Sequence, residues 1–436
     1  MLRSVLAAML AAGPAGAETV FSVRLVGHAV LPAATFSAPP PEAPRDARIS
    51  GKFAVGPGRV DAPGAAGARP SPPFAGQPLQ GISGFATERA RDGSIFAVLD
   101  NGFGSRANSP DALLSFVRMR ADVSTGAVEV TERVWLRDPD RVVPFRIAYE
   151  GSEARHLTGA DFDPESIQVL GETVWIGEEF GPHLIRATLD GVVTGVFAAE
   201  LDGRPLRSPD HPALRIPAEA GRDWRVPRSG GFEGLGLQPG TGLLWAMAER
   251  PILTPDGDPE AFLRAFAFDP AAEAWTGESL RLRLAAGATA IGDLTFVDEV
   301  RALVIERDGG EGDPSLECDG PPAPDCFAHP ARLKRVVLID IAETDADGFV
   351  RRIGHVDLMD LEDPDGIGRV ETDAARDLTG RYTLPFATIE SVTTAGEGRI
   401  LVAVDNNLPF STGRRLGVPA DTEVVLLEVR ALLAAE

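Results

Sequence analysis

One short pattern recurs five times along the chain and limits the folds that the chain can adopt. Each copy has a small or acidic residue, an apolar strand, a turn, a second apolar strand and a final acidic residue. The copies span residues 81–101, 163–179, 231–250, 291–307 and 388–407. Two further strands follow each of the first four copies, and four antiparallel strands per repeat are typical of a β-propeller blade.

The fifth copy is followed by a single strand, predicted over residues 423–429. One strand between Thr19 and Leu31 can supply the missing partner, because ring closure across the termini removes an exposed sheet edge. The sequence therefore predicts an all-β fold, a β-propeller with five visible repeats, closed by the N-terminal strand. A degenerate blade within residues 18–80 or 308–385 would make six blades, and a β-sandwich with coincidental acidic residues is the alternative.

The N-terminus has the features of a secretory signal. Arg3 precedes an apolar run from Val5 to Ala12, and Ala15-Gly16-Ala17 is a small-x-small cleavage pattern. We expect a signal peptide over residues 1–17, a Pro/Gly-rich segment with the closing strand over 18–80, and the propeller domain over 81–436. The protein is then periplasmic or secreted, whereas the alternative for the first residues is a short buried helix.

The two cysteines fit an exported protein. Cys318 and Cys326 flank a short Pro-rich loop, which predicts a local disulfide in an oxidising compartment. No later stretch has the roughly 20 uncharged residues that a membrane-spanning helix needs. We therefore expect no membrane span.

The charge balance excludes one class of partner. The chain of 436 residues has 42 Lys and Arg against 64 Asp and Glu, a net charge of −22. Nucleic-acid binding requires basic surfaces that displace counterions, so we expect no nucleic-acid partner. We expect a monomer that acts on a small molecule.

The repeated acidic residues are predicted to meet. The ends of a hairpin lie side by side on one rim of a sheet, so acids at strand starts and hairpin ends should converge on one mouth of the channel. Ser83 is the odd member at the strand starts. The strand starts carry Glu165, Glu233, Asp293 and Glu390, and the hairpin ends carry Asp100, Glu178 or Glu179, Glu249, Glu306 and Asp405.

So many carboxylates in one place need a positive partner, because like charges in a desolvated site repel and raise each other's pKa. An all-oxygen site without clustered His or Cys suits a hard cation, Ca²⁺ before Mg²⁺. The alternative is that Arg250 and Arg307 neutralise the acids, or that the acids cap strand ends by accepting backbone hydrogen bonds.

The same residues carry a family resemblance. The order of Gly81-Ile82-Ser83-Gly84, Pro164-Glu165-Ser166, Gly231-Phe232-Glu233-Gly234-Leu235, Glu306-Arg307 and Asp405-Asn406-Asn407 resembles the exported bacterial phytase-like family, labelled "esterase-like activity of phytase". The resemblance covers about residues 80–429 and implies a β-propeller with calcium-assisted hydrolysis of phosphate or other esters. Ser166 and Ser391 stand where that family often has glycine.

If the protein is a hydrolase, its residues divide into three roles. We expect a carboxylate base to accept a proton and arginines to bind a phosphoryl group. The predicted metal ligands are Glu165, Glu233, Asp293, Glu390 and Asp405, the base is Glu249 or Glu179, and the substrate-binding residues are Arg250, Arg307, Arg414 and Arg415. With only two lysines and strong negative charge, we favour a small or weakly charged ester over a highly anionic substrate.

Two other functions stay open. A non-catalytic propeller would bind a ligand or protein on the same face and hold any metal as a structural ion. A lactonase-type propeller enzyme would share the metal site and act on a cyclic ester. Both enzymatic hypotheses predict metal-dependent turnover, and the binding hypothesis predicts none.

Overall fold

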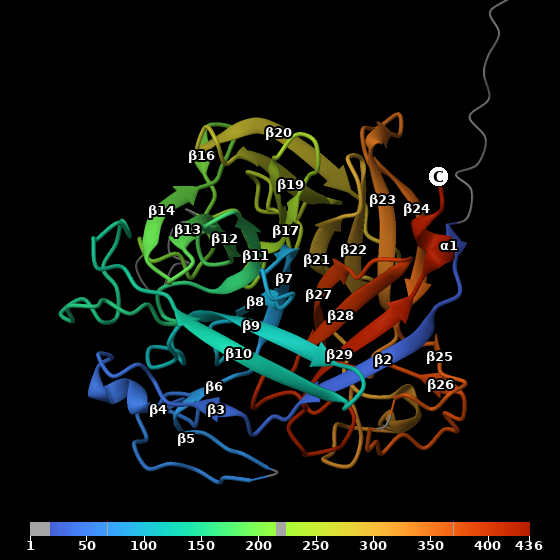
Figure 1. Ribbon diagram of the computed structural model, residues 1–436, viewed down its shortest axis with the longest axis horizontal. Helices are drawn as coiled ribbons and strands as arrows, with labels where there is room; N and C mark the ends of the chain where they lie inside the picture. The colour runs from blue at the N-terminus through green and yellow to red at the C-terminus, as the bar shows by residue number, and fades with distance from the viewer. Residues whose placement is uncertain (1–17, 68, 215–223, 369) are drawn as a thin grey trace, which may run out of the picture.

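The computed structural model describes residues 18–67, 69–214, 224–368 and 370–436 (Figure 1). The predicted signal peptide, residues 1–17, lies outside the described residues. Helical structure in the described ranges is limited to three short segments: η1 Arg45–Arg48, η3 Pro314–Leu316 and α1 Arg430–Leu433. The all-β prediction is confirmed.

Most strands belong to five sets of four, with antiparallel neighbours inside each set. The first set contains β7 Ile82–Arg89, β8 Ile95–Leu99, β9 Ser115–Asp122 and β10 Ala127–Trp135. The second contains β11 Pro164–Leu170, β12 Thr173–Glu178, β13 His183–Thr188 and β14 Val193–Ala198. The third contains β17 Phe232–Leu237, β18 Leu244–Ala248, β19 Leu263–Asp269 and β20 Ala274–Leu282.

The last two sets each receive a strand from the N-terminal segment. The fourth contains β21 Ala290–Phe296, β22 Arg301–Arg307, β23 Lys334–Thr344 and β24 Val350–Asp357, with β1 Thr19–Val20 added parallel to β24. The fifth contains β27 Thr388–Thr394, β28 Arg399–Asp405, β29 Thr422–Glu428 and β2 Arg24–Leu31. The remaining strands have two residues each: β3 Phe36–Ser37, β4 Ile49–Ser50, β5 Phe74–Ala75, β6 Gln77–Pro78, β15 Glu200–Leu201, β16 Arg204–Pro205, β25 Leu361–Glu362 and β26 Arg381–Tyr382.

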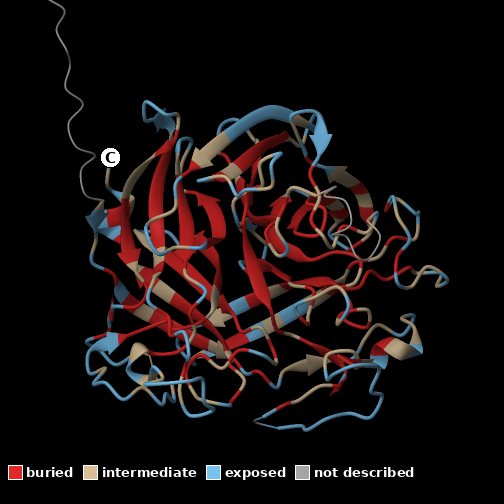
Figure 2. Ribbon diagram, turned by 180° about the vertical axis from the view of Figure 1, so that it is seen from behind, coloured by how far each residue is buried: buried red, intermediate tan, exposed pale blue. Residues whose placement is uncertain are grey.

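The first strands of the five sets form a closed circuit of contacts. β7 contacts β11, β11 contacts β17, β17 contacts β21, β21 contacts β27, and β27 contacts β7. These strands are buried over most of their length, whereas β10 and β20, last in their sets, are largely exposed (Figure 2). The first strands therefore surround the interior of the molecule.

The N-terminal strand supplies the partner that the fifth set lacks. β2 pairs antiparallel with β29, from Arg24 opposite Glu428 to Leu31 opposite Thr422. The prediction of one strand from Thr19 to Leu31 was too simple, because the structure divides this stretch into β1 and β2. β1 joins the fourth set instead, where Thr19 pairs with Gly354.

Small residues let neighbouring first strands approach closely. A Cβ on Gly84 would lie 2.9 Å from the Cα of Ser166, and a Cβ on Gly292 would overlap the carbonyl oxygen of Ile389. Ser166 and Ser391 link two other pairs of neighbouring strands, β11 to β17 and β27 to β7. The hydroxyl of Ser166 donates to the Phe232 carbonyl at 3.4 Å, and that of Ser391 donates to the Ile82 carbonyl at 3.5 Å.

The Pro/Gly-rich N-terminal segment packs against two loops that follow β8 and β28. Phe74 of this segment lies in an apolar cluster with Phe103 and Ala112 from the first loop and Leu408 from the second. The buried amide of Gln77 donates to the Asp111 carbonyl at 2.9 Å, in the same first loop. The segment therefore holds both loops in place.

Two further predictions concern the disulfide and the membrane. Cys318 and Cys326 form the predicted disulfide, with their Cα atoms 5.0 Å apart. In the described part of the chain, no helix is long and apolar enough to cross a membrane.

Candidate functional site

Each of the five first strands has a bulge at the same place. The pairing with the second strand skips one residue between Ile82 and Gly84, and likewise in the other four sets. A bulge leaves one residue unpaired and turns its side chain in a new direction. The skipped residues are Ser83, Glu165, Glu233, Gly292 and Glu390.

The ends of the second strands form a second equivalent series. The backbone N–H of Glu179 donates to the backbone carbonyl of Asp163 at 2.9 Å, and that of Glu249 donates to the backbone carbonyl of Gly231 at 2.8 Å. In each set, backbone pairing between the start of the first strand and the end of the second strand places one second-strand residue beside the bulge. These residues are Asp100, Glu179, Glu249, Arg307 and Asp405, so the fourth set contributes an arginine where the others contribute an acid.

All members of the two series except Ser83 and Gly292 line one cavity of about 210 Å³, which we call the acidic pocket. Eight acidic side chains and two arginines line it, so negative charge is in excess. Its lining residues are Asp100, Asn101, Gly104, Asp163, Glu165, Glu179, Ser229, Glu233, Glu249, Arg250, Arg307, Thr388, Glu390, Asp405 and Asn407.

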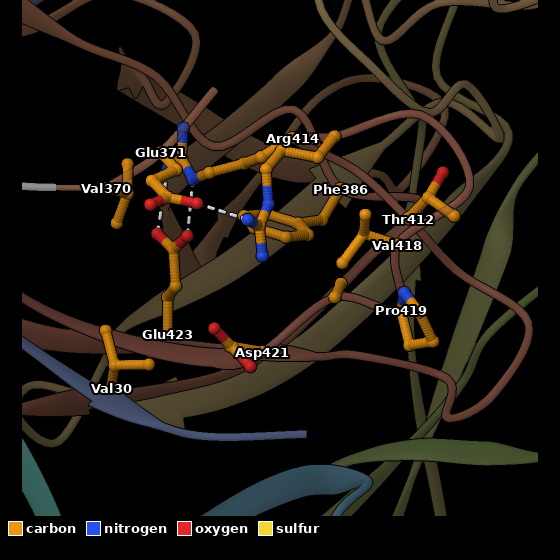
Figure 3. A pocket seen from close by; sticks show the side chains of 12 residues that line it. Val30, Val370, Glu371, Phe386, Thr412, Arg414, Val418, Pro419, Asp421 and Glu423 are labelled. Atoms are coloured by element: carbon orange, nitrogen blue, oxygen red, sulfur yellow. Dashed lines mark hydrogen bonds and ion pairs between the residues drawn. The ribbon is translucent and has the colours of Figure 1, made fainter. Parts of the chain in front are cut away.

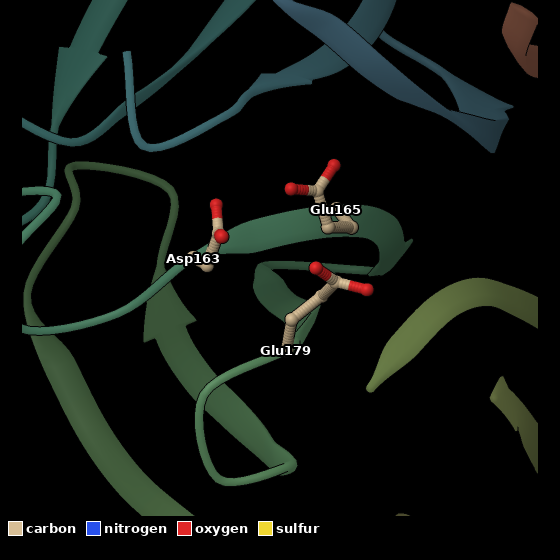
Figure 4. A group of neighbouring side chains, drawn as sticks. All are labelled: Asp163, Glu165 and Glu179. Carbon is tan, nitrogen blue, oxygen red and sulfur yellow. The ribbon is translucent and has the colours of Figure 1, made fainter. Parts of the chain in front are cut away.

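Three carboxylates on one side of the acidic pocket are close enough to share a cation. One oxygen from each of Asp163, Glu165 and Glu179 lies within 4.8 Å of the others (Figure 4). All three side chains are buried, and Oε1 of Glu179 has no hydrogen-bond partner. Burial raises the pKa of all three, and the neighbouring acids add to the shift for Glu165 and Glu179; the pKa of Asp163 rises to about 7.

This geometry fits a hard divalent cation. Carboxylate oxygens are the ligands that Ca²⁺ prefers, and a cation would remove both the repulsion and the unpaired buried oxygen of Glu179. Asp163 was missed among the predicted ligands. Asp163 opens the second copy of the repeat, directly before β11, and this position was the available signal.

The opposite side of the acidic pocket already contains a cation. Nη2 of Arg307 lies 2.7 Å from Oε1 of Glu249, 3.3 Å from Oε1 of Glu390 and 3.7 Å from Oε1 of Glu233. Burial lowers the pKa of Arg307, but these carboxylates outweigh that effect and raise it overall. Arg250 adds a second contact, 2.9 Å from Oε2 of Glu249.

In the described residues, the close arginine pairs of the pocket are therefore with Glu233, Glu249 and Glu390, while Arg250 acts on Glu179 from a greater distance and opposes the rise of its pKa. Burial raises the pKa of Glu249, and Arg307 and Arg250 oppose the rise. Burial also raises the pKa of Asp405, to about 6. Arginine neutralisation, which the sequence left as an alternative to a metal, is present on this side, whereas no arginine contacts the three carboxylates of Figure 4 in the described residues.

Asp293 does not join the acidic pocket. It stands one residue after the bulge, where the other sets have Gly84, Ser166, Gly234 and Ser391, and the bulge position itself is Gly292. Its carboxylate accepts from the backbone N–H groups of Leu294 at 2.7 Å and Val392 at 2.8 Å. Asp293 thus links β21 to β27, and burial raises its pKa to about 8.

Glu178 and Glu306 also point elsewhere, because each precedes the residue that faces the acidic pocket. Glu178 accepts from the backbone N–H of Gly181 at 2.6 Å and lies 2.5 Å from Nδ1 of His183. Glu306 pairs with Arg352 at 2.9 Å. Of the predicted pair Glu178 or Glu179, only Glu179 lines the pocket.

Arg414 and Arg415 lie in a different pocket, formed by the loop after β28 (Figure 3). The buried guanidinium of Arg414 donates to Oε2 of Glu423 at 2.8 Å and to the Thr383 carbonyl at 2.7 Å. Arg415 pairs with the exposed Glu371. Neither arginine lines the acidic pocket, and these partners hold both of them in the other one.

A substitution at Arg307 tests whether this arginine neutralises the neighbouring carboxylates. In Arg307→Met the carboxylates of Glu233, Glu249 and Glu390 lose their buried cation, so we expect the free energy of unfolding to fall by roughly 3 kcal/mol in urea titrations. The matched variant Arg120→Met breaks an exposed pair with Asp92 and should leave stability unchanged. Equal stability of the two variants would show that protons, not Arg307, neutralise these acids.

The family model described as "Phytase-like: Esterase-like activity of phytase" matches residues 77–408. No curated protein matches the chain.

Several solved structures are similar at low identity. A protein of unknown function from Dyadobacter fermentans DSM 18053 has 11% identity and a TM-score of 0.40, covering 94% of this chain and 100% of its own. Native Bacillus subtilis arabinanase has 10% identity and a TM-score of 0.35, covering 80% and 93%. A calcium-binding protein, regucalcin, from Agrobacterium tumefaciens str. C58 has 11% identity and a TM-score of 0.33, covering 81% and 93%. At such scores these likenesses carry no argument about function.

Proposed function

Since this chain belongs to the phytase-like family and three buried carboxylates meet in its acidic pocket, we propose that it is a metal-dependent hydrolase of phosphate or other esters. The observation that carries the proposal is the cluster of Asp163, Glu165 and Glu179 with its unpartnered Glu179 oxygen. The disulfide supports an exported protein, periplasmic or secreted, because such bonds persist in oxidising compartments.

We propose that the five sets of strands are the blades of a β-propeller over residues 81–436, closed by β2. The closed circuit of contacts among the first strands supports this arrangement, and so does the β2–β29 pairing. Between residues 308 and 385, the described strands outside the fourth set are β25 and β26, of two residues each, which favours five blades over six.

Asp163, Glu165 and Glu179 would hold the cation, Ca²⁺ before Mg²⁺. A bound divalent cation supplies Lewis-acid polarisation of an ester oxygen and stabilises negative charge in the transition state. Glu390 and Asp405 remain candidate ligands because they line the same pocket. Glu179 therefore moves from candidate base to candidate ligand.

The proton acceptor is assigned to Glu233. Glu249 contacts both Arg307 and Arg250, and it would orient these two arginines rather than accept a proton. Glu233 is buried, and its Oε1 has no hydrogen-bond partner and lies 3.7 Å from Nη2 of Arg307, farther than the 2.7 Å of Glu249. Burial and neighbouring carboxylates raise its pKa, which brings a carboxylate closer to the range that suits general-base catalysis near neutral pH.

Arg250 and Arg307 would bind the substrate's oxygens. Arg250 is 45% exposed and lines the acidic pocket, so its guanidinium can reach an incoming phosphoryl or carboxyl ester. The excess of acids over arginines favours an ester of low charge over a highly anionic one.

A non-catalytic binding protein is the second candidate. The ion pairs of Arg307 favour it, because they offset part of the buried negative charge without any turnover. In that function the cation would be structural.

The test is a hydrolysis assay on a phosphate monoester, a carboxyl ester and a lactone, first in EDTA and then with Ca²⁺ restored. We expect at least one class to be hydrolysed with Ca²⁺ and none in EDTA, and turnover of the lactone alone would identify the lactonase-type activity. Absence of turnover in folded, calcium-loaded protein would contradict a hydrolase and favour the binding protein.

A further inference from the structure

An exposed phenylalanine stands at the rim of the acidic pocket. Phe410 is 54% exposed, and the other strongly exposed large apolar side chains of the described residues are aliphatic. Its ring atom Cε2 lies 4.0 Å from the point where a Cβ on Gly104 would be, and Gly104 lines the acidic pocket. Because Gly104 has no side chain, it leaves the space beside the ring uncovered.

The exposure of Phe410 is held by its loop. The N–H of Phe410 donates to the carbonyl of Asn407 at 2.7 Å, and the N–H of Asn407 donates to Oδ1 of Asp405 at 2.7 Å. Leu408, two residues before the phenylalanine, is buried in the apolar cluster with Phe74 and Phe103. One end of the loop is thus fixed to the acidic pocket and its middle to the N-terminal segment.

The loop is also anchored on the other side of Phe410. Oε1 of Glu311 accepts from the backbone N–H of Gly413 at 2.7 Å and from that of Thr412. Because residues on both sides of Phe410 are anchored, its ring is held in a defined position in water. Exposing this apolar surface to water is unfavourable.

No apolar side chain lines the acidic pocket. Every lining residue except Gly104 has a charged or polar side chain, and the cavity of about 210 Å³ has room for a small polar group. Any apolar part of a ligand must therefore lie outside the cavity, and Phe410 is the exposed apolar side chain at that rim.

We infer that Phe410 is a specificity-determining residue and that the preferred ligands carry an aromatic ring next to their polar group. The ring packs on Phe410 while the polar group enters the acidic pocket. If the protein hydrolyses esters as proposed, its substrates are aryl esters. Only this assignment of the substrate rests on the proposed function.

The test measures binding, so that it does not depend on turnover. Dissociation constants are measured by calorimetry with Ca²⁺ present for two pairs of non-ester probes: phenylphosphonate against methylphosphonate, and benzoate against acetate. We expect the ring-bearing member of at least one pair to bind about three- to tenfold more tightly, the range of an aromatic pair contact. Phe410→Ala should bring that ratio close to one, Phe410→Leu should lower it in part, and Phe410→Tyr should keep it.

Leu189→Ala is the matched control, because Leu189 is an exposed apolar residue at the turn after β13, at the end of its set opposite the acidic pocket. It should leave the ratio unchanged. Failure of wild type to prefer either ring-bearing probe, or an unchanged preference in Phe410→Ala, would overturn the inference even if esters are hydrolysed. A ring preference that Phe410→Ala removes, in a protein that hydrolyses no ester, would uphold it and refute the hydrolase.

Discussion

Calcium is expected to raise the thermal midpoint of this protein by roughly 3 °C over the EDTA-treated form, at about 100 times its dissociation constant. A ligand that binds only the folded state stabilises that state by mass action, and Asp163, Glu165 and Glu179 come together only on folding. Differential scanning calorimetry of protein shown to be metal-free at the start gives the measurement.

The calcium effect should grow with pH. Burial raises the folded-state pKa of Asp163 from 3.8 to about 7 and that of Asp405 from 3.8 to about 6. The folded protein keeps these protons after the unfolded chain has released them, so this stabilisation is complete below about pH 4 and is lost as pH rises through 6–7. Calcium competes with the protons, and we expect a larger calcium shift at pH 8 than at pH 5.

A matched pair of variants assigns the shift to the site. Glu165→Gln should remove most of the calcium effect, because it takes away one of the three clustered carboxylates. Glu172→Gln changes the same residue type at the exposed turn of the same β11–β12 hairpin and should keep the effect. An equal shift in both variants would place the ion elsewhere.

Glu233→Gln is expected to lower turnover of the best substrate by at least about 100-fold, the usual contribution of a positioned general base. The amide is close to the carboxylate in shape but cannot accept the proton. Because Glu233 lies outside the cluster of three carboxylates, the variant should keep the calcium shift, so loss of activity with an intact shift would identify a catalytic effect.

The control for this variant is Glu278→Gln, on the exposed strand β20. It should retain both activity and stability. Full activity in folded Glu233→Gln would show that another group accepts the proton, and Glu249 would be tested next.

Much of the fold was predictable because its signals are local in the chain. Alternating apolar strands and turns between residues 81 and 429 identify the strands, and the fivefold repeat groups them. The strand from the N-terminal end was predicted to complete the fifth set, and β2 does so. The disulfide between Cys318 and Cys326 followed from their short separation.

The acids were predictable in kind but not individually. Glu165, Glu233 and Glu390 occupy bulge positions and line the acidic pocket as the repeat predicted. The prediction that Asp293 joins the other acids was wrong, because it was aligned with Glu233 and Glu390 as an acidic residue and not by its position in the strand. Matching Ile291 to Phe232 would have placed Gly292 at the bulge of the fourth set.

By itself, the sequence determined that the chain forms repeated hairpins whose ends carry carboxylates, because strand alternation and repeat spacing depend only on neighbouring residues. The tertiary structure decided which of those side chains share a pocket, since a bulge of one residue turns Glu165, Glu233 and Glu390 inward, whereas in the fourth set it falls on Gly292 and leaves Asp293 outside. It also decided that Arg307 pairs with three acids, while no arginine of the described residues forms a close ion pair with Asp163, Glu165 or Glu179. Such choices depend on contacts between residues far apart in the chain, where charge and burial are set by partners that no local pattern specifies.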